Sequence, residues 1–179
     1  MVKRQKKPFF YFDDLKNVDK VTLGIYIICT LALAIIYGLA DVETIEKAIF
    51  TYIFGPQIYF IFFLYVSLRN LKSYLIWSCF GLLHLLLFVI FRYNSPLSGI
   101  NGNPACLGVN TIILLLLFQC FRFVSIKFQR REFVNPAKSM NGKDLIEGTK
   151  VSALDYLISI VYFFAVIGFA CLSVVYFKE

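Results

Sequence analysis

The stretch VTLGIYIICTLALAIIYGLA, residues 21–40, contains twenty residues and not one charged side chain. A helix of this length rises about 1.5 Å per residue and so reaches the ~30 Å thickness of a bilayer hydrocarbon core. The stretch therefore predicts a transmembrane helix. The rest of the chain repeats the pattern, with long apolar segments separated by short polar links.

Composition favours a membrane protein over a soluble one. Of the 179 residues, 59% are hydrophobic and only 16% are charged, whereas soluble domains carry about 25% charged residues. We predict an all-α, polytopic integral membrane protein in which residues 1–20 form a tail and residues 21–179 form one membrane domain. Its five spans are predicted at about 21–40, 48–68, 73–91, 107–126 and 151–177. The fourth span contains Arg122, which we expect to snorkel to the interface.

Basic residues fall on alternate sides of these spans. With the N-terminus in the cytoplasm, the basic and aromatic tail, the link at 69–72 and the loop at 122–150 hold 15 of the 18 Lys and Arg residues. Positively charged loops are retained in the cytoplasm. We therefore expect the N-terminus inside and the C-terminus outside, in a cell membrane, with a bacterial inner membrane as the leading assignment. The tail has neither the early apolar run nor the cleavage site of a secretory signal.

Polar side chains inside predicted spans are candidate functional residues, because they are costly in hydrocarbon. The candidates are His84, Gln57, Asn110 and Gln119. His84 is the foremost, since imidazole titrates near neutral pH. It is either a proton-handling or ligand-contacting group or a hydrogen-bonded packing residue, and the second interpretation is favoured. Asn110 and Gln119 are nine residues apart, which places them on opposite helix faces rather than along one channel wall.

Small residues and a proline mark the first two spans. Gly55 and Pro56 predict a helix break in the second span, which is either a simple kink or, as in some transporters, part of a substrate site. The kink is favoured because no internal repeat supplies a matching break. Thr30, Ala34 and Gly38 recur every four residues in the first span and form a face suited to close helix packing.

The loop at 122–150 carries seven basic and three acidic residues. Anionic lipid headgroups are the default partner of such a segment. A cytoplasmic protein is the alternative partner, with Lys127, Arg130 and Arg131 as the candidate contacts. Aromatic residues between these cations also suit RNA, but nucleic acid is not the partner that we expect.

No motif identifies an enzyme or a cofactor. The chain has no nucleotide-binding glycine loop, no HExxH, no GxSxG and only one histidine. We therefore predict no catalytic residue, no metal site and no cofactor. The five cysteines show no CxxC spacing. Cys106 and Cys171 both fall near the outer face, and whether they pair stays open.

Three classes of function remain. The leading hypothesis is a non-enzymatic membrane subunit or accessory protein that packs into a homo-oligomer or a larger assembly and binds a cytoplasmic partner or anionic lipid through its basic segments. The first alternative is a small oligomeric channel, transporter or membrane-perturbing effector, for example in antiviral defence. The second is a membrane-embedded lipid- or glycan-modifying enzyme, which would need acid–base residues to converge from distant spans.

Overall fold

A computed structural model describes residues 9–93, 97, 102–140, 142–144 and 148–176. Its long helices are α1 (Asn17–Leu39), α2 (Val42–Phe62), α3 (Leu71–Phe91), α4 (Gly108–Gln129) and α5 (Ala153–Tyr176). The short elements are the 3-10 helices η1 (Ser67–Arg69), η3 (Pro104–Leu107) and η4 (Pro136–Lys138) and the antiparallel strands β1 (Ser139–Met140) and β2 (Lys143–Asp144). The predicted helical fold is confirmed. The first eight residues of the basic tail and the predicted end of the fifth span at residue 177 lie outside the described residues.

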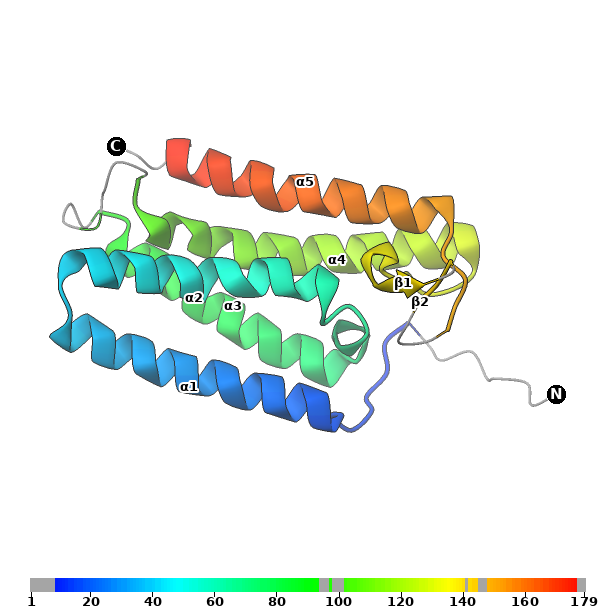
Figure 1. The fold of residues 1–179 in the computed structure, drawn as a ribbon, viewed down its shortest axis with the longest axis horizontal. Helices are drawn as coiled ribbons and strands as arrows, with labels where there is room; N and C mark the ends of the chain where they lie inside the picture. The colour runs from blue at the N-terminus through cyan, green and yellow to red at the C-terminus, as the bar shows by residue number, and fades with distance from the viewer. Residues whose placement is uncertain (1–8, 94–96, 98–101, 141, 145–147, 177–179) are drawn as a thin grey trace.

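Consecutive long helices run antiparallel (Figure 1). Helices α1, α3 and α5 begin at one end of the bundle, which we call the basic end, and α2 and α4 begin at the opposite end, which we call the acidic end. Helix α4 packs against α2, α3 and α5, whereas α1 packs mainly on α2 and lies at the edge of the bundle. The chain therefore crosses the bundle five times, and α1 keeps most of its surface open.

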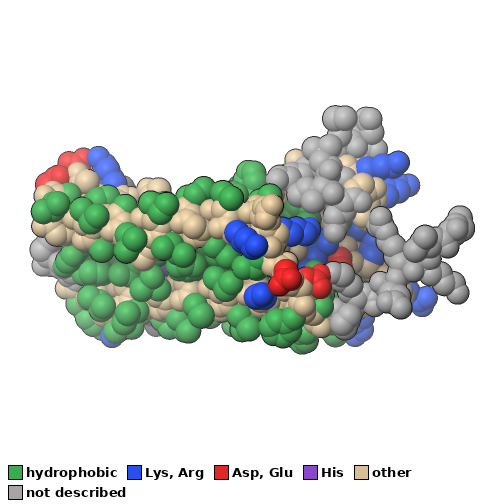
Figure 2. All heavy atoms as spheres, turned by 90° about the horizontal axis from the view of Figure 1, so that it is seen from below, with side chains coloured by type: hydrophobic (Ala, Val, Ile, Leu, Met, Phe, Trp, Pro, Cys, Tyr) green, Lys and Arg blue, Asp and Glu red, His purple; other side chains and the backbone are tan. Residues whose placement is uncertain are grey.

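Four stretches of the described chain are long and apolar enough to cross a membrane, namely α1, α3, Pro104–Gln129 and α5. Hydrophobic side chains cover the middle of the face seen in Figure 2, and charged side chains gather toward its two ends. Large apolar residues such as Ile28, Leu86 and Phe164 are more than half exposed. An apolar surface of this extent favours lipid rather than water as its surroundings. The structure thus supports a transmembrane protein.

Helix α2 begins earlier than the predicted span at 48–68. The polar link before that span forms the first turns of the helix, from Val42 onward. Glu43 suits a helix N-terminus, and its carboxylate lies 2.6 Å from the Lys47 ammonium one turn later. Charged residues that stabilise a helix start lower the local hydropathy as a polar loop does, so hydropathy alone does not locate this start.

Helix α2 also ends earlier than predicted. It continues as a helix through Gly55 and Pro56 and stops at Phe62, so these two residues do not end it, and a kink at Pro56 stays a prediction. The chain then turns through η1, where the hydroxyls of Ser67 and Ser73 bond each other at 2.7 Å. Because the two hydroxyls bond each other, this turn needs no charged residue, and the sequence stays apolar beyond the end of the helix. Hydropathy therefore did not mark the end of α2 at Phe62. The other four helices match their predicted spans to within about one turn.

Two glycines allow α3 to approach the start of α4 closely. A Cβ atom on Gly108 would lie 2.2 Å from the backbone oxygen of His84, and one on Gly81 would lie 2.7 Å from Cδ1 of Ile112. Both distances are shorter than van der Waals contact. These glycines therefore place the middle of α3, with His84, directly against α4 and η3.

Candidate functional site

His84 lies inside the helix bundle with no exposed surface. Its Nε2 is 2.5 Å from the hydroxyl of Tyr26 on α1, and its Nδ1 is 2.8 Å from the hydroxyl of Thr111 on α4. Gln57 of α2 donates through Nε2 to the Thr111 hydroxyl at 3.0 Å and to the Leu107 carbonyl at 2.9 Å. The structure thus brings two of the predicted intramembrane candidates, His84 and Gln57, into one polar cluster shared by four helices.

The partners of this cluster fix the tautomer of His84. The Tyr26 hydroxyl lies 2.9 Å from the backbone oxygen of Tyr52, which can only accept, so its single proton points there. Nε2 of His84 then carries a proton and donates to the Tyr26 oxygen, and in the neutral form of the imidazole Nδ1 accepts from the Thr111 hydroxyl. Gln57 donates to Thr111 in turn. The hydrogen bonds therefore run in one direction across a neutral imidazole and end on a backbone carbonyl.

Thr30 joins the cluster from α1. Its hydroxyl donates to the Tyr26 carbonyl at 2.9 Å, which leaves it to accept a hydrogen bond from the Tyr52 hydroxyl at 2.8 Å. The other members of the predicted packing face, Ala34 and Gly38, are exposed, and a Cβ atom on Gly38 would meet nothing within 4 Å. Within the described chain, this face is open beyond Thr30.

Sequence reasoning missed the hydroxyl groups of the cluster. Tyr26, Tyr52 and Thr111 lie in predicted spans but are not among the candidates predicted from the sequence. The available signal was their type, because a hydroxyl at bilayer depth needs a partner. The partners of these hydroxyls are 22 to 58 residues away along the chain, so spacing alone did not pair them.

Asn110 and Gln119 lie apart from the His84 cluster and serve different neighbours. Oδ1 of Asn110 accepts from the Ser173 hydroxyl at 2.8 Å and so links α4 to α5. Nε2 of Gln119 donates to the Leu68 carbonyl at 3.2 Å near the basic end. Each amide therefore fixes one contact of α4.

A buried ion pair at the basic end was not expected from the sequence. Arg122 is 1% exposed, and it contacts both carboxylate oxygens of Glu132, with Nε–Oε2 at 2.8 Å and Nη2–Oε1 at 2.6 Å. Its Nη2 also donates to the Phe9 carbonyl at 2.6 Å, and Nε of Arg69 lies 3.9 Å from Glu132. The expected snorkelling of Arg122 is wrong, because a bidentate carboxylate partner offsets much of the cost of burying its charge.

Asp155 forms a second buried pair at the start of α5. The guanidinium of Arg131 binds its carboxylate, and the backbone N–H and hydroxyl of Ser152 donate to it at 2.9 and 3.0 Å. Arg131, predicted as a cytoplasmic contact, thus fastens the loop to α5. The other two predicted contacts, Lys127 and Arg130, are exposed. Arg130 ends α4 with a positive φ of 56°.

The segment before α1 is fixed at the same end of the bundle. The Asn70 amide donates to the Asp13 carbonyl at 2.8 Å, and the backbone N–H of Leu71 donates to the Tyr11 carbonyl at 3.0 Å. Arg122 holds the same segment through Phe9. The described part of the tail, the start of α3 and the loop after α4 therefore form one joined surface.

The described residues contain no group of three His, Cys, Asp or Glu side chains that could hold a metal ion. Cys106 is buried, whereas Cys171 is exposed, and no disulfide joins these two residues. Comparisons with protein-family models, curated proteins and solved structures find no match. The features that can indicate a function are therefore the polar cluster around His84, the buried ion pairs of Arg122 and Asp155, and the surfaces around them.

Proposed function

We propose that this chain is a non-enzymatic subunit of a membrane assembly that presents a basic surface to an anionic cytoplasmic partner. The observation that carries the proposal is the division of the cations at the basic end into two kinds. Arg69, Arg122 and Arg131 pair with carboxylates inside the protein. Among the residues that the structure describes, the exposed cations of this end are Lys16, Lys20, Lys72, Lys127, Arg130, Lys143 and Lys150.

The internal ion pairs hold in place the backbone segments that carry the exposed cations. Arg122 and Glu132 tie the loop to the segment before α1, and Arg131 and Asp155 tie it to α5. A preformed surface loses less conformational entropy on binding than a flexible one. Each exposed cation contributes about 1 kcal/mol near an anionic lipid surface. A rigid cluster of such cations suits lipid headgroups or an acidic protein.

The proposed topology has five membrane crossings, with the basic end in the cytoplasm. Helix α2 is 21 residues long and lies beside the four apolar helices, which supports its crossing as well. The described parts of the three basic segments lie at one end of the bundle, and retention of positive charge in the cytoplasm supports the assignment of that end to the cytoplasm. Reporter fusions after Lys150 and at Glu179 should give opposite locations. If both report the same compartment, the topology is refuted.

Two further observations favour a structural subunit over a transporter or an enzyme. Both ring nitrogens of His84 are engaged by hydroxyls, and its hydrogen-bond chain ends on a backbone carbonyl that cannot pass a proton on. A general base must instead reach a proton of its substrate. The exposed face at Ala34 and Gly38 supports packing against a second copy or another membrane subunit.

The test neutralises the two exposed cations of the loop and spares Arg131. The protein with Lys127→Gln and Arg130→Gln, held in zwitterionic nanodiscs, should bind vesicles of anionic lipid about 30-fold more weakly, since two charges are worth about 2 kcal/mol. The control is Lys127→Arg with Arg130→Lys, which keeps both positive charges at the same positions and should leave vesicle binding unchanged. A pull-down from cytosol, run in parallel, separates the two partners: a loss confined to the pull-down assigns the surface to a protein. Unchanged binding in both assays rejects the basic surface.

A further inference from the structure

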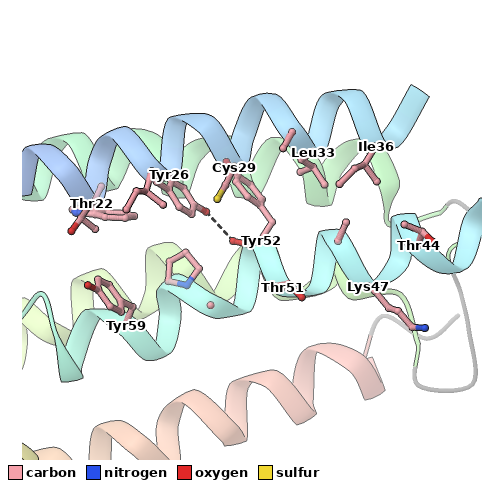
Figure 3. Close-up of a pocket in the computed structure, with 16 residues that line it drawn as sticks. Thr22, Tyr26, Cys29, Leu33, Ile36, Thr44, Lys47, Thr51, Tyr52 and Tyr59 are labelled. Carbon is pink, nitrogen blue, oxygen red and sulfur yellow. Dashed lines mark hydrogen bonds between the residues drawn. The ribbon is translucent and has the colours of Figure 1, made fainter. Parts of the chain in front are cut away.

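Two apolar grooves flank α2 on either side. The first has a volume of about 780 Å³ and lies between α1 and α2 (Figure 3). The second has a volume of about 750 Å³ and lies between α2, η3 and α5. Apolar and aromatic side chains dominate both linings, including Leu33, Pro56 and Trp77 in the first and Phe54 and Ile167 in the second.

The two grooves share residues on one ridge of α2. Lys47 and Thr51 line both grooves, and Gly55, one turn further along, lines the first. All three residues are exposed. Thr51 and Gly55 are small, and a Cβ atom on Gly55 would meet nothing within 4 Å. The ridge that separates the grooves is therefore low just beyond Lys47, so one ligand can cross it.

The wall of the first groove is preformed. The rings of Tyr26 and Tyr52 stack at 4.9 Å with an angle of 10°, and the Tyr26 ring lies 5.1 Å from that of Trp77. The dashed bond in Figure 3 holds the Tyr26 hydroxyl on the Tyr52 carbonyl. His84 bonds the Tyr26 hydroxyl, and Thr30 bonds the Tyr52 hydroxyl. Rigid apolar walls of this kind are typical of binding sites for apolar ligands.

The first groove is long enough for an acyl chain. Its lining runs along α1 from Thr22 to Ile36, and these fourteen steps of a helix span about 21 Å. One leaflet of the hydrocarbon core is only about 15 Å thick. A lipid tail that enters at the acidic end can therefore lie along the groove over its whole length.

The charges at the shared mouth have a definite pattern. Lys47 lines both grooves, and Glu43 and Glu46 line the second. The Lys47 side chain extends from α2 away from α1 (Figure 3), and it pairs with Glu43 at 2.6 Å while both remain 73% exposed. Such an exposed pair is weak, so a ligand can exchange into it. One cation beside two carboxylates matches a phosphate that carries an ammonium group.

We propose that the two grooves bind one diacyl phospholipid with an ethanolamine headgroup, one acyl chain on each side of α2, its phosphate at Lys47 and its ammonium at Glu43 and Glu46. The lipid would occupy the leaflet at the acidic end, opposite the basic surface. This site rests on the helices lying in a membrane and goes beyond the partner proposed for the basic end.

The test uses Trp77, the only tryptophan of the chain, which lines the first groove. The purified protein in detergent is titrated with phosphatidylethanolamine whose acyl chains carry bromine, which quenches nearby indole. We expect quenching that saturates at one lipid per protein and is reversed by unbrominated lipid. Quenching that rises linearly with lipid concentration and does not saturate would mean that only annular lipid is detected, and it would overturn the proposal.

Groove-filling variants locate the two chains. Gly55→Phe and Ala32→Phe fill the first groove from opposite walls, and Ala170→Phe fills the second. Each variant should lower the affinity for unbrominated lipid, measured as its displacement of the brominated lipid, by about tenfold or more. This is the expected effect of losing the burial of a few methylene groups. Gly24→Phe is the matched control, because a Cβ atom there meets open space outside both grooves. Equal affinity of all four variants and the unmodified protein rejects the site.

The headgroup and the number of chains are tested separately. Lys47→Gln should weaken binding about fivefold, the worth of one charge at a lipid surface. Phosphatidylglycerol, which lacks the ammonium group, and lysophosphatidylethanolamine, which has a single chain, should both compete less well than the diacyl ethanolamine lipid. Equal competition by phosphatidylglycerol refutes the headgroup assignment, and equal competition by the single-chain lipid refutes the straddling of α2.

Discussion

Replacement of His84 by leucine should destabilise the bundle by about 1–3 kcal/mol. The change removes the interhelical bonds to Tyr26 and Thr111, and such bonds in membrane proteins average about 0.6 kcal/mol with a maximum near 1.7. The Thr111 hydroxyl also loses its acceptor. His84→Gln should cost less than about 1 kcal/mol, since its amide offers one donor and one acceptor to the same partners.

Equilibrium unfolding in mixed micelles, with rising sodium dodecyl sulfate and Trp77 fluorescence as the signal, measures both changes. Ser78→Ala is the matched control, because the Ser78 hydroxyl bonds only the Tyr74 carbonyl of its own helix among the contacts that the structure describes. A leucine variant as stable as the unmodified protein would refute the role of the cluster in stability. A glutamine variant that folds and assembles normally but is inactive would refute the structural interpretation and move a proton-handling role ahead of it.

Two further changes test the packing and the basic end. Gly108→Ala should lower the free energy of unfolding by about 1–3 kcal/mol, because the new Cβ atom would lie 2.2 Å from the His84 carbonyl oxygen. Gly168→Ala is the control, because its Cβ atom meets nothing within 4 Å. It should change the free energy of unfolding by no more than about 0.5 kcal/mol in the same assay. Glu132→Gln should cost about 3–5 kcal/mol because it strands a buried guanidinium, and adding Arg122→Met should recover much of that loss. A double variant that is no more stable than Glu132→Gln alone would contradict the pairing.

The sequence predicted the helices because hydropathy is a local property. Four of the five predicted spans match helices to within about one turn, and basic segments that were assigned to one side meet at one end of the structure. The second span failed at both ends, since the charged turn at Glu43 and Lys47 is helical and the apolar run after Phe62 is not. Local composition does not reveal that charged residues stabilise the start of a helix, nor that the hydroxyls of a turn bond each other.

The sequence also pointed to His84 and Gln57, because any polar group at bilayer depth is costly and so stands out. It did not pair them with each other or with Tyr26 and Thr111, which lie on other helices. A helix exposes the same residues whichever neighbour it meets. The choice of neighbour is set by close approaches such as that of Gly108 to the His84 backbone.

The fate of the charged residues was decided by the tertiary structure. Arg122 was expected at the interface, because an isolated cation in a span lowers its energy by reaching water. The fold instead places Glu132 and the carbonyl of Phe9, which is 113 residues away along the chain, around its guanidinium. The sequence by itself determined how many charged residues separate the apolar segments and at which end of the helix bundle most of the described cations lie. Only the three-dimensional packing decided which are consumed in internal pairs and which remain free to bind, because the cost of burying a charge depends on the partners that surround it.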